Sequence, residues 1–217
     1  MGNQLLGTQE TRPGRWAASE KKERLLAAAR ELMLKKGYPA TTVDQICEAA
    51  GVTKGAFFHY FDSKESLGRA VIERFVSDLV ETFRSGPFRE IADPLGRVYA
   101  YIGFTIDVCK EAILQDGCIL GVFSQELGDT NSEIRSLCDL SFRGWAQDLK
   151  GLLDEAKGQV PAGGSIDTEA LAEQFIAIVE GSLILRKAYQ DPRVIERALN
   201  QFRDHVRLLF AGSSGRE

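Results

Sequence analysis

The sequence predicts an all-α protein of about nine helices. Apolar residues recur at steps of three and four along most of the 217-residue chain, and no stretch alternates apolar and polar residues as a half-buried strand does. Glycines and prolines interrupt the pattern at the ends of the apolar stretches, where turns between helices are expected. With 44% hydrophobic and 27% charged residues, the composition is that of an ordinary globular protein.

The first helix is expected to begin near Ser19, after a flexible arm that spans residues 1–18. Leu25, Ala29 and Met33 recur on one face of this segment and predict an amphipathic helix. Gly37 is suited to end the helix, because glycine readily adopts the left-handed conformation that closes many helices.

Two short helices follow, and each has a capping residue at its start. Thr42 stands three positions before Gln45, which is a capping box, and Gly51 ends the helix that begins there. Thr53 is a candidate N-cap for the next helix, which is expected over residues 54–61.

A long fourth helix is expected from residue 63 to about residue 84. Asp62 and Glu65 form another capping box, in which Ser63 competes as the cap. Gly86 and the proline after it end the helix. We therefore expect residues 19–66 to form one domain and the residues after them to form another.

The remaining segment, residues 67–211, continues with longer helices, and residues 212–217 are expected to be a disordered tail. The expected helices begin at Pro94 and span about residues 118–127, 131–157, 167–189 and 192–211.

The two short helices and the turn between them have the spacing of a helix-turn-helix motif. The turn covers residues 50–53, and its glycine, Gly51, permits the positive φ that the turn requires. Thr53 caps the second helix and leaves its N-terminal amides facing outward, where a phosphate can bind. Phe57 and Phe61 are four residues apart on this helix, so both should be buried on one side.

The other side of this second helix is poorly explained by packing in a protein core. It presents Lys54, Gly55, Ala56, Phe58, His59 and Tyr60. The two small residues let the backbone approach the floor of a DNA major groove, and Lys54 can reach a guanine edge or a phosphate. His59 and Tyr60 can donate hydrogen bonds to phosphates. These features predict a recognition helix that binds double-stranded DNA.

Here the chain resembles the DNA-binding domain of TetR-family transcriptional regulators. The run AGVTKGAFFHYF, from Ala50 to Phe61, and the run SKESL after it carry the resemblance, which extends over about residues 20–75. It implies an N-terminal helix-turn-helix head and a C-terminal domain for ligand binding and dimerisation. It also implies a homodimeric repressor that binds a palindromic operator and is released by a small-molecule effector.

The resemblance assigns DNA contacts residue by residue. Phosphate contacts fall on Thr42, Tyr60 and Lys64, and base or groove contacts fall on Thr53, Lys54, Gly55, Ala56 and His59. Phe58 departs from the family, which often has tyrosine at this position. Phe58 lacks the hydroxyl for a phosphate bond, but it can touch a thymine methyl group.

The C-terminal domain should contain the effector site and the dimer interface. Residues that we expect at a mostly apolar ligand cavity are Phe104, Cys109, Cys118, Phe123 and Trp145. In the family the last two helices pair across a two-fold axis. The apolar stripes expected at this interface are Phe175, Val179 and Leu183 on one helix and Ile195, Leu199, Phe202 and Val206 on the other.

Cys118 has two interpretations. The segment around it is similar to a subgroup of the family that includes electrophile- and redox-sensing members, and a thiol near a helix N-terminus should have a lowered pKa. An electrophile-sensing repressor that uses Cys118, or Cys109, is therefore one hypothesis. The alternative is a small buried apolar residue, which is the usual role of a free cysteine.

Composition argues against several other classes of protein. No apolar run reaches the roughly 18 residues of a membrane span, and the N-terminus lacks the apolar stretch of a secretory signal. We therefore expect no membrane partner and a cytoplasmic location. With two histidines and no CxxC pair, no metal site or other cofactor is expected. No paired nucleophile and base is visible, which argues against an enzyme.

Because the net charge of the chain is −4, any surface that binds DNA must be confined to one part of the molecule. Residues 1–65 hold ten Lys and Arg against eight Asp and Glu, whereas the rest of the chain is acidic. Arg12 and Arg15 in the arm suit either a minor-groove contact or a disordered tail. The alternative to a regulator is a constitutive DNA-binding protein with a non-transcriptional role.

Overall fold

The computed structural model describes residues 13–160 and 166–212. Within these residues the chain forms nine α-helices and one short 3₁₀ helix, η1. The elements are α1 (Pro13–Lys36), α2 (Val43–Ala50), α3 (Lys54–Tyr60), α4 (Lys64–Arg84), η1 (Pro87–Glu90), α5 (Pro94–Val108), α6 (Ile119–Leu127), α7 (Ser132–Lys157), α8 (Thr168–Tyr189) and α9 (Arg193–Gly212). The prediction of an all-α fold with nine helices is confirmed for the described residues.

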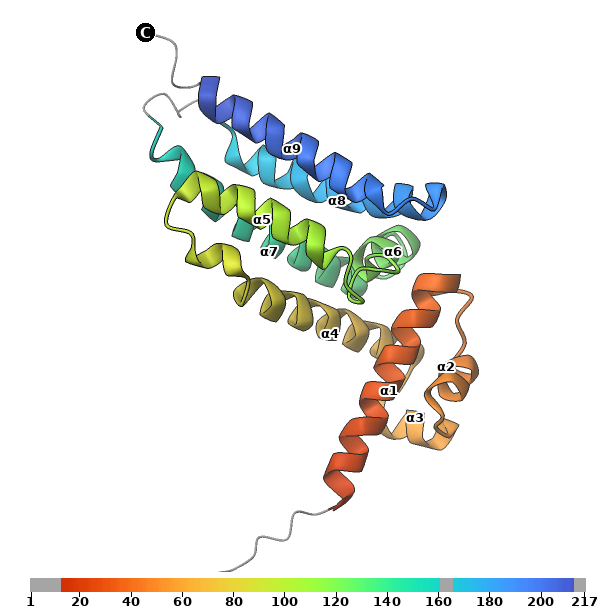
Figure 1. Cartoon of the computed structure of the whole chain (residues 1–217). Coiled ribbons are helices and arrows are strands. Elements are labelled where there is room, and N and C mark those ends of the chain that lie inside the picture. The colour runs from red at the N-terminus through yellow and green to blue at the C-terminus, as the bar shows by residue number, and fades with distance from the viewer. Residues whose placement is uncertain (1–12, 161–165, 213–217) are drawn as a thin grey trace, which may run out of the picture.

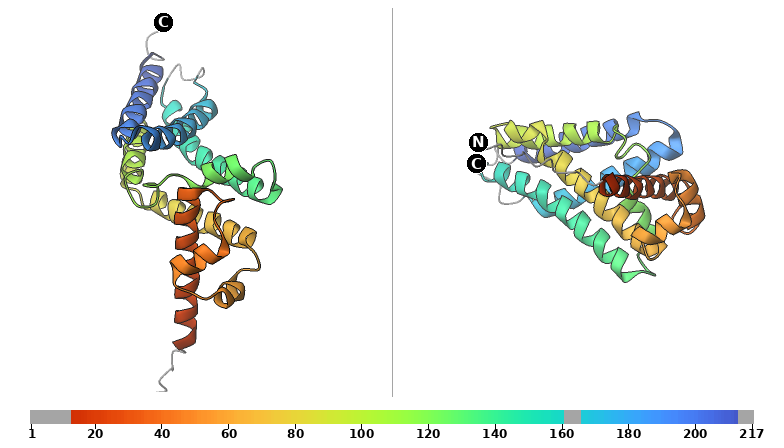
Figure 2. Two further views of the ribbon diagram at one scale, coloured as in Figure 1. Left: turned by 90° about the vertical axis from the view of Figure 1, so that its right-hand side faces the viewer. Right: turned by 90° about the horizontal axis from the view of Figure 1, so that it is seen from below.

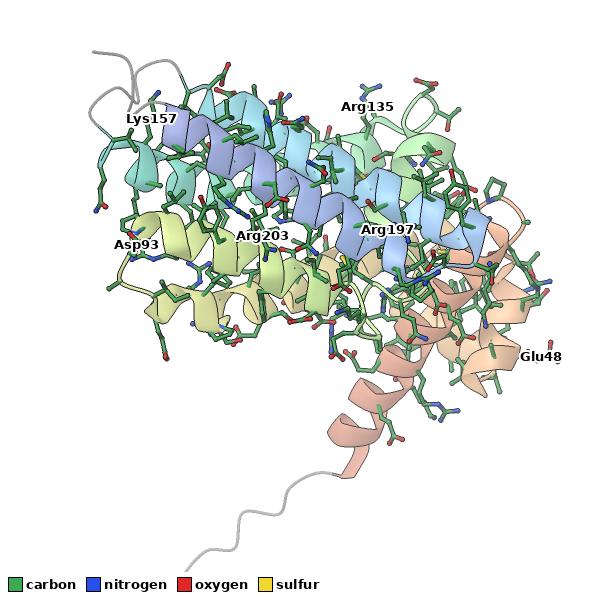
Figure 3. All side chains as sticks on the ribbon, turned by 45° about the horizontal axis from the view of Figure 1, so that its top comes forward. Glu48, Asp93, Arg135, Lys157, Arg197 and Arg203 are labelled. Atoms are coloured by element: carbon green, nitrogen blue, oxygen red, sulfur yellow. The ribbon has the colours of Figure 1, made fainter. Side chains whose placement is uncertain are left out.

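Helices α1 to α3 form a head that projects from a bundle made by α4 to α9 (Figure 1). The N-terminal part of α1 extends away from the bundle in both side views (Figures 1 and 2). Within the bundle, α8 packs against both α7 and α9, and α5 packs against α7 and α9. Glu48 on α2 and Lys157 at the end of α7 lie at opposite ends of the molecule (Figure 3).

The head is held together by the apolar face of α1. Leu25, Ala29 and Met33 are fully buried, as the sequence pattern predicts, and they share one core with Ile46 of α2 and Phe57 of α3. Burying the larger of these side chains contributes on the order of 2 kcal/mol each, which is enough to fix two short helices that would not be stable alone.

Two boundaries and one element differ from the prediction. α1 begins at Pro13 and not near Ser19, because proline at the first position of a helix is already set in a helical φ. Ser63, and not Asp62, caps α4, and its partner in the capping box is Ser66. η1 was not predicted. The first twelve residues, including Arg12, and residues 213–217 lie outside the described residues.

The head and the bundle are joined by polar contacts as well as by α4. The backbone N–H of Tyr38, just after α1, donates to Glu126 of α6 at 2.6 Å. Lys187 of α8 donates to the carbonyl of Leu34 at 3.2 Å, and Arg30 of α1 donates to the carbonyl of Ile113 in the α5–α6 connection. These hydrogen bonds attach α6, α8 and the α5–α6 connection to the base of the head.

Among the described residues, no helix combines the length and the apolar character that a membrane crossing requires.

Candidate nucleic-acid interface

The turn between α2 and α3 is set by Gly51. Its φ of 61° lies in the left-handed region that favours glycine. The carbonyl of Gly51 accepts a hydrogen bond from Arg24 of α1 at 3.0 Å, and the Arg24 guanidinium also donates to the carbonyl of Ala50. Arg24 thus attaches the turn to the helix that supports it, a role with no local signal in the sequence.

Both predicted caps are present. Thr42 accepts from the backbone N–H of Gln45 at 3.2 Å, and the Gln45 side chain accepts from the N–H of Thr42 at 3.3 Å. Thr53 accepts from the N–H of Ala56 at 3.2 Å. Thr42, Thr53 and Gly55 are all exposed. The first turn of α3 therefore faces solvent, where its remaining free amides can meet a phosphate.

The two faces of α3 differ as the sequence predicts. Phe57 is fully buried and Phe61 is 5% exposed, whereas Phe58 is 51% exposed and His59 is also exposed. Tyr60 is half-buried, and its ring lies 4.8 Å from that of His59. An aromatic ring left half in water is unfavourable in the free protein, so Phe58 is available for an apolar contact with a partner.

Lys54 has an intramolecular partner that the sequence analysis missed. Its ammonium lies 2.8 Å from the carboxylate of Asp44 on α2. This hydrogen bond raises the pKa of Lys54, so the side chain stays charged. Both side chains are largely exposed, and exposed pairs of this kind contribute little stability. Lys54 can therefore leave Asp44 when a phosphate or a base edge is offered.

Lys64 is placed differently from the other predicted contacts. Its ammonium donates to the carbonyls of Tyr38 and Thr41, both at 3.0 Å, and lies 4.2 Å from the centre of the Tyr38 ring. The side chain is half-buried. It fastens the α1–α2 connection to the start of α4, so a phosphate contact by Lys64 would compete with this internal role.

The five residues expected at a ligand cavity do not gather at one site. Trp145 lines a cavity of about 480 Å³ between α4, α6 and α7. Cys118 lines a different cavity of about 350 Å³. Phe104, Cys109 and Phe123 line neither of these two cavities. Phe123 instead packs edge-on against Tyr38, 5.4 Å between ring centres, where the bundle meets the head.

The expected lowering of the Cys118 pKa is wrong. Cys118 is the N-cap of α6, and the N–H groups of Leu120 and Gly121 do favour its thiolate. Burial acts against them and is the largest effect, and the nearby carboxyl of Glu180 adds to it, so the pKa of Cys118 is raised well above its usual value. The side chain is therefore a neutral thiol, and the structure gives no support to an activated sensor cysteine.

The residues predicted for the dimer interface also require correction. They are buried inside the protomer, because α8 and α9 use these stripes to pack against each other and against α5 and α7. The residues that the structure removes from the predicted interface are Phe175, Val179, Leu183, Ile195, Leu199, Phe202 and Val206, all of which are at most 4% exposed. The apolar residues that these helices expose are others, among them Ile184 at 57% and Leu208 at 70%.

The comparisons with known proteins agree with this architecture. Residues 25–71 match the family model for "Bacterial regulatory proteins, tetR family", and residues 94–202 match "Tetracyclin repressor-like, C-terminal domain". The crystal structure of a regulatory protein TetR from Rhodobacter sphaeroides is similar with a TM-score of 0.74 and 27% identity, over 84% of this chain and 97% of that one.

Curated relatives are regulators as well. The transcriptional repressor DhaR of a Mycobacterium species is 26% identical over 178 residues, which cover 82% of this chain and 88% of the relative. The transcriptional regulator AcuR of Cereibacter sphaeroides is 29% identical over 192 residues, with coverage of 87% and 86%. The described residues form nine α-helices with an exposed helix-turn-helix, and the family models match residues 25–71 and 94–202. This protein therefore belongs to the TetR family of bacterial DNA-binding transcriptional regulators.

Proposed function

We propose that this protein is a cytoplasmic, homodimeric repressor that binds a palindromic operator and leaves it when a small-molecule effector binds. The observation that carries the proposal is the outer face of α3, which exposes a cation, a small residue and two aromatic rings beside capped, outward-facing amides. In the described part of the chain, Lys54, Gly55, Phe58 and His59 stay exposed, so burial does not account for that face.

In this proposal α3 lies in the major groove. Lys54, Gly55 and Ala56 are nearest the bases, and Thr42 and Tyr60 contact the phosphates on either side. Two heads in a dimer read two half-sites about 34–36 Å apart, or a multiple of this distance. The operator is therefore expected to be an inverted repeat.

Release by an effector requires that the ligand prefer a head position that does not fit this spacing. The larger cavity is well placed for such a ligand, because Leu79 and Phe83 of α4 form part of its wall opposite Trp145 of α7. α4 also begins next to the recognition helix. A ligand that separates α4 from α7 tilts α4 and changes the distance between the two heads.

Selection of bound sequences from a random pool of duplex DNA tests the proposal. We expect the wild type to enrich an inverted repeat and a variant with Lys54→Ala and His59→Ala to lose that enrichment. Lys35→Ala is the matched control, because it removes an exposed lysine of the same head that stands in the last turn of α1 and pairs with Glu31 of that helix. An equal enrichment by both variants, or no enrichment by the wild type, would refute the assignment of α3 as the recognition helix.

A further inference from the structure

A second cavity, separate from the one between α4 and α7, lies where the head meets the bundle. It has a volume of about 350 Å³ and is lined by the last turn of α1, by α6 and the residues just before it, and by the second half of α8. Leu34, Val122 and Ile184 supply apolar wall, and the two cavities share no lining residue. The volume is at the lower end of the range for sites that bind small molecules.

The polar group that marks this cavity is the carboxyl of Glu180 on α8. Cys118 donates a hydrogen bond to it, but Oε1 has neither solvent contact nor a hydrogen-bond partner within the described part of the chain. Burial raises the pKa of Glu180. An unsatisfied carboxyl oxygen is costly, and rotation about its terminal bond is easy, so a donor in the adjoining cavity can reach it after a small turn.

The charges around the cavity leave Glu180 uncompensated. Asp116 and Glu180 are the acidic residues of the lining, and Lys187 is its only cation. The Lys187 ammonium donates to the carbonyl of Leu34 at 3.2 Å, while Arg30, which lies outside the lining, is close enough to Asp116 to interact with its charge. Neither acidic residue forms an ion pair with any residue that the structure describes.

We propose that this cavity is a binding site for a small organic cation, in which an ammonium or amidinium group meets Glu180 and a short hydrocarbon part lies against Leu34, Val122 and Ile184. Gly121 makes the approach possible. A Cβ at residue 121 would stand 2.3 Å from Oε2 of Glu180, so the backbone of α6 comes close to the carboxyl only because this residue has no side chain.

The position of the site connects it to the head. Leu34 lies in the last turn of α1, and its carbonyl accepts a hydrogen bond from Lys187 of α8. Four residues further on, the N–H of Tyr38 is held by Glu126 of α6. A cation bound between α6 and α8 changes the spacing of these two helices, both of which are hydrogen-bonded to the C-terminal end of α1 or to the residues just after it. The consequence for operator release rests on the proposed function, whereas the binding itself does not.

Benzylammonium is a suitable probe, and benzyl alcohol is its neutral counterpart. In calorimetric titrations of the full chain, we expect saturable binding of benzylammonium and much weaker binding of benzyl alcohol. Glu180→Gln preserves shape and removes the charge, so the affinity for benzylammonium should fall by about tenfold or more. Glu173→Gln, at an exposed position of the same helix, is the matched control and should bind like the wild type.

Nuclear magnetic resonance of the wild type locates the site without any variant. Benzylammonium should shift the backbone amides of Gly117 and Gly121 more than the amide of Gly144, which belongs to the other cavity. The proposal is overturned if benzylammonium does not bind, if it binds Glu180→Gln as tightly as the wild type, or if the shifts centre on Gly144. None of these measurements requires DNA, so they remain valid even if α3 proves not to bind an operator.

Discussion

The cations around the recognition helix divide into two kinds. Lys54 is held only by an exposed pair with Asp44, so it can exchange this partner for DNA at little cost. Lys64 donates to two backbone carbonyls and lies over an aromatic ring, so its removal disturbs the protein itself. The two lysines are ten residues apart, and only their surroundings distinguish them. Lys54 is free to contact DNA, whereas Lys64 stabilises the fold.

Lys54→Ala is expected to weaken operator binding roughly ten- to hundredfold and to relax the preference at one base position. Stability should stay close to that of the wild type, because the lost pair is exposed. Binding isotherms on the selected operator and on single-base variants measure both effects. If affinity for the selected operator and for its variants falls by one common factor, Lys54 contacts phosphate and not a base.

Lys64→Ala is expected to lower the free energy of unfolding by about 1–2 kcal/mol, because two carbonyls lose a charged donor. Urea denaturation measures this loss. Lys36→Ala, an exposed lysine at the end of α1, is the control and should have little effect. The opposite outcome is an unchanged stability and a salt dependence of DNA binding that falls by about one ion. Lys64 would then be a phosphate contact, as the family resemblance implies, and not a structural residue.

Buried thiols should make the protein less stable in alkali. Burial raises the pKa of Cys109 to about 12, although Arg186 opposes the shift. The unfolded thiol loses its proton near pH 8.5 and the folded one does not, so the unfolded state binds fewer protons and stability falls as pH rises between about 8.5 and 12. The expected slope is about 1 kcal/mol per pH unit for this thiol.

Urea denaturation under reducing conditions, at pH 7, 8, 9 and 10, compares the wild type with Cys109→Ala. The difference in stability between them should be constant up to pH 8 and then shrink, because only the wild type carries this thiol. Tyr38 also has a raised pKa, but it is present in both proteins and cancels. Parallel curves up to pH 10 would show that the thiol ionises in the folded protein as it does in the unfolded chain.

At the scale of elements, the features that could be predicted are those that depend on neighbours in sequence. The caps at Thr42 and Thr53 and the left-handed Gly51 follow from residues three or fewer positions apart, and all are present. The start of α1 differs from the prediction because the helical periodicity begins only near Ser19, whereas Pro13 at the first helical position favours an earlier start.

The function of an apolar stripe is harder to predict than its existence. Periodicity shows that Phe175 and Leu199 lie on the inner faces of their helices, but it does not say whether the partner is another helix of the protomer or of a second copy. Packing of α8 against α7 and α9 decides for the protomer.

Thr53→Ala tests the N-terminus of α3, the helix that we propose contacts the DNA bases. Loss of the cap at the N-terminus of α3 should cost about 1 kcal/mol of stability and weaken binding to all DNA sequences, since the first-turn amides lose their fixed direction. Thr53→Ser keeps the hydroxyl and should behave like the wild type in thermal unfolding and in binding. A stable Thr53→Ala variant with normal DNA binding would remove the cap from the account of the interface.

On the scale of the whole molecule, the links between head and bundle join residues far apart in the chain. Glu126 and Tyr38 are 88 positions apart, and Lys187 reaches Leu34 across 153. No local pattern marks such pairs, so neither the cavity beside Glu180 nor the burial of Cys118 could be predicted from the sequence. Both arise only when α1, α6 and α8 are brought together.

The packing of the last two helices predicts which side chains a dimer can use. Their inner stripes are used within the protomer, so a dimer formed by α8 and α9 must use exposed side chains such as Ile184 and Leu208. Replacing both with aspartate should give a folded monomer, because a dimer would have to bury two unpaired charges in each protomer.

Leu140→Asp is the matched control, since Leu140 is 67% exposed but belongs to α7, where it lines the cavity beside α4. Sedimentation velocity at micromolar concentration should show a dimer for the wild type and the control and a monomer for the double variant. The monomer should bind a single half-site weakly and lose the preference for an inverted repeat, because each head then binds alone. A double variant that stays dimeric would place the interface on another face of the bundle.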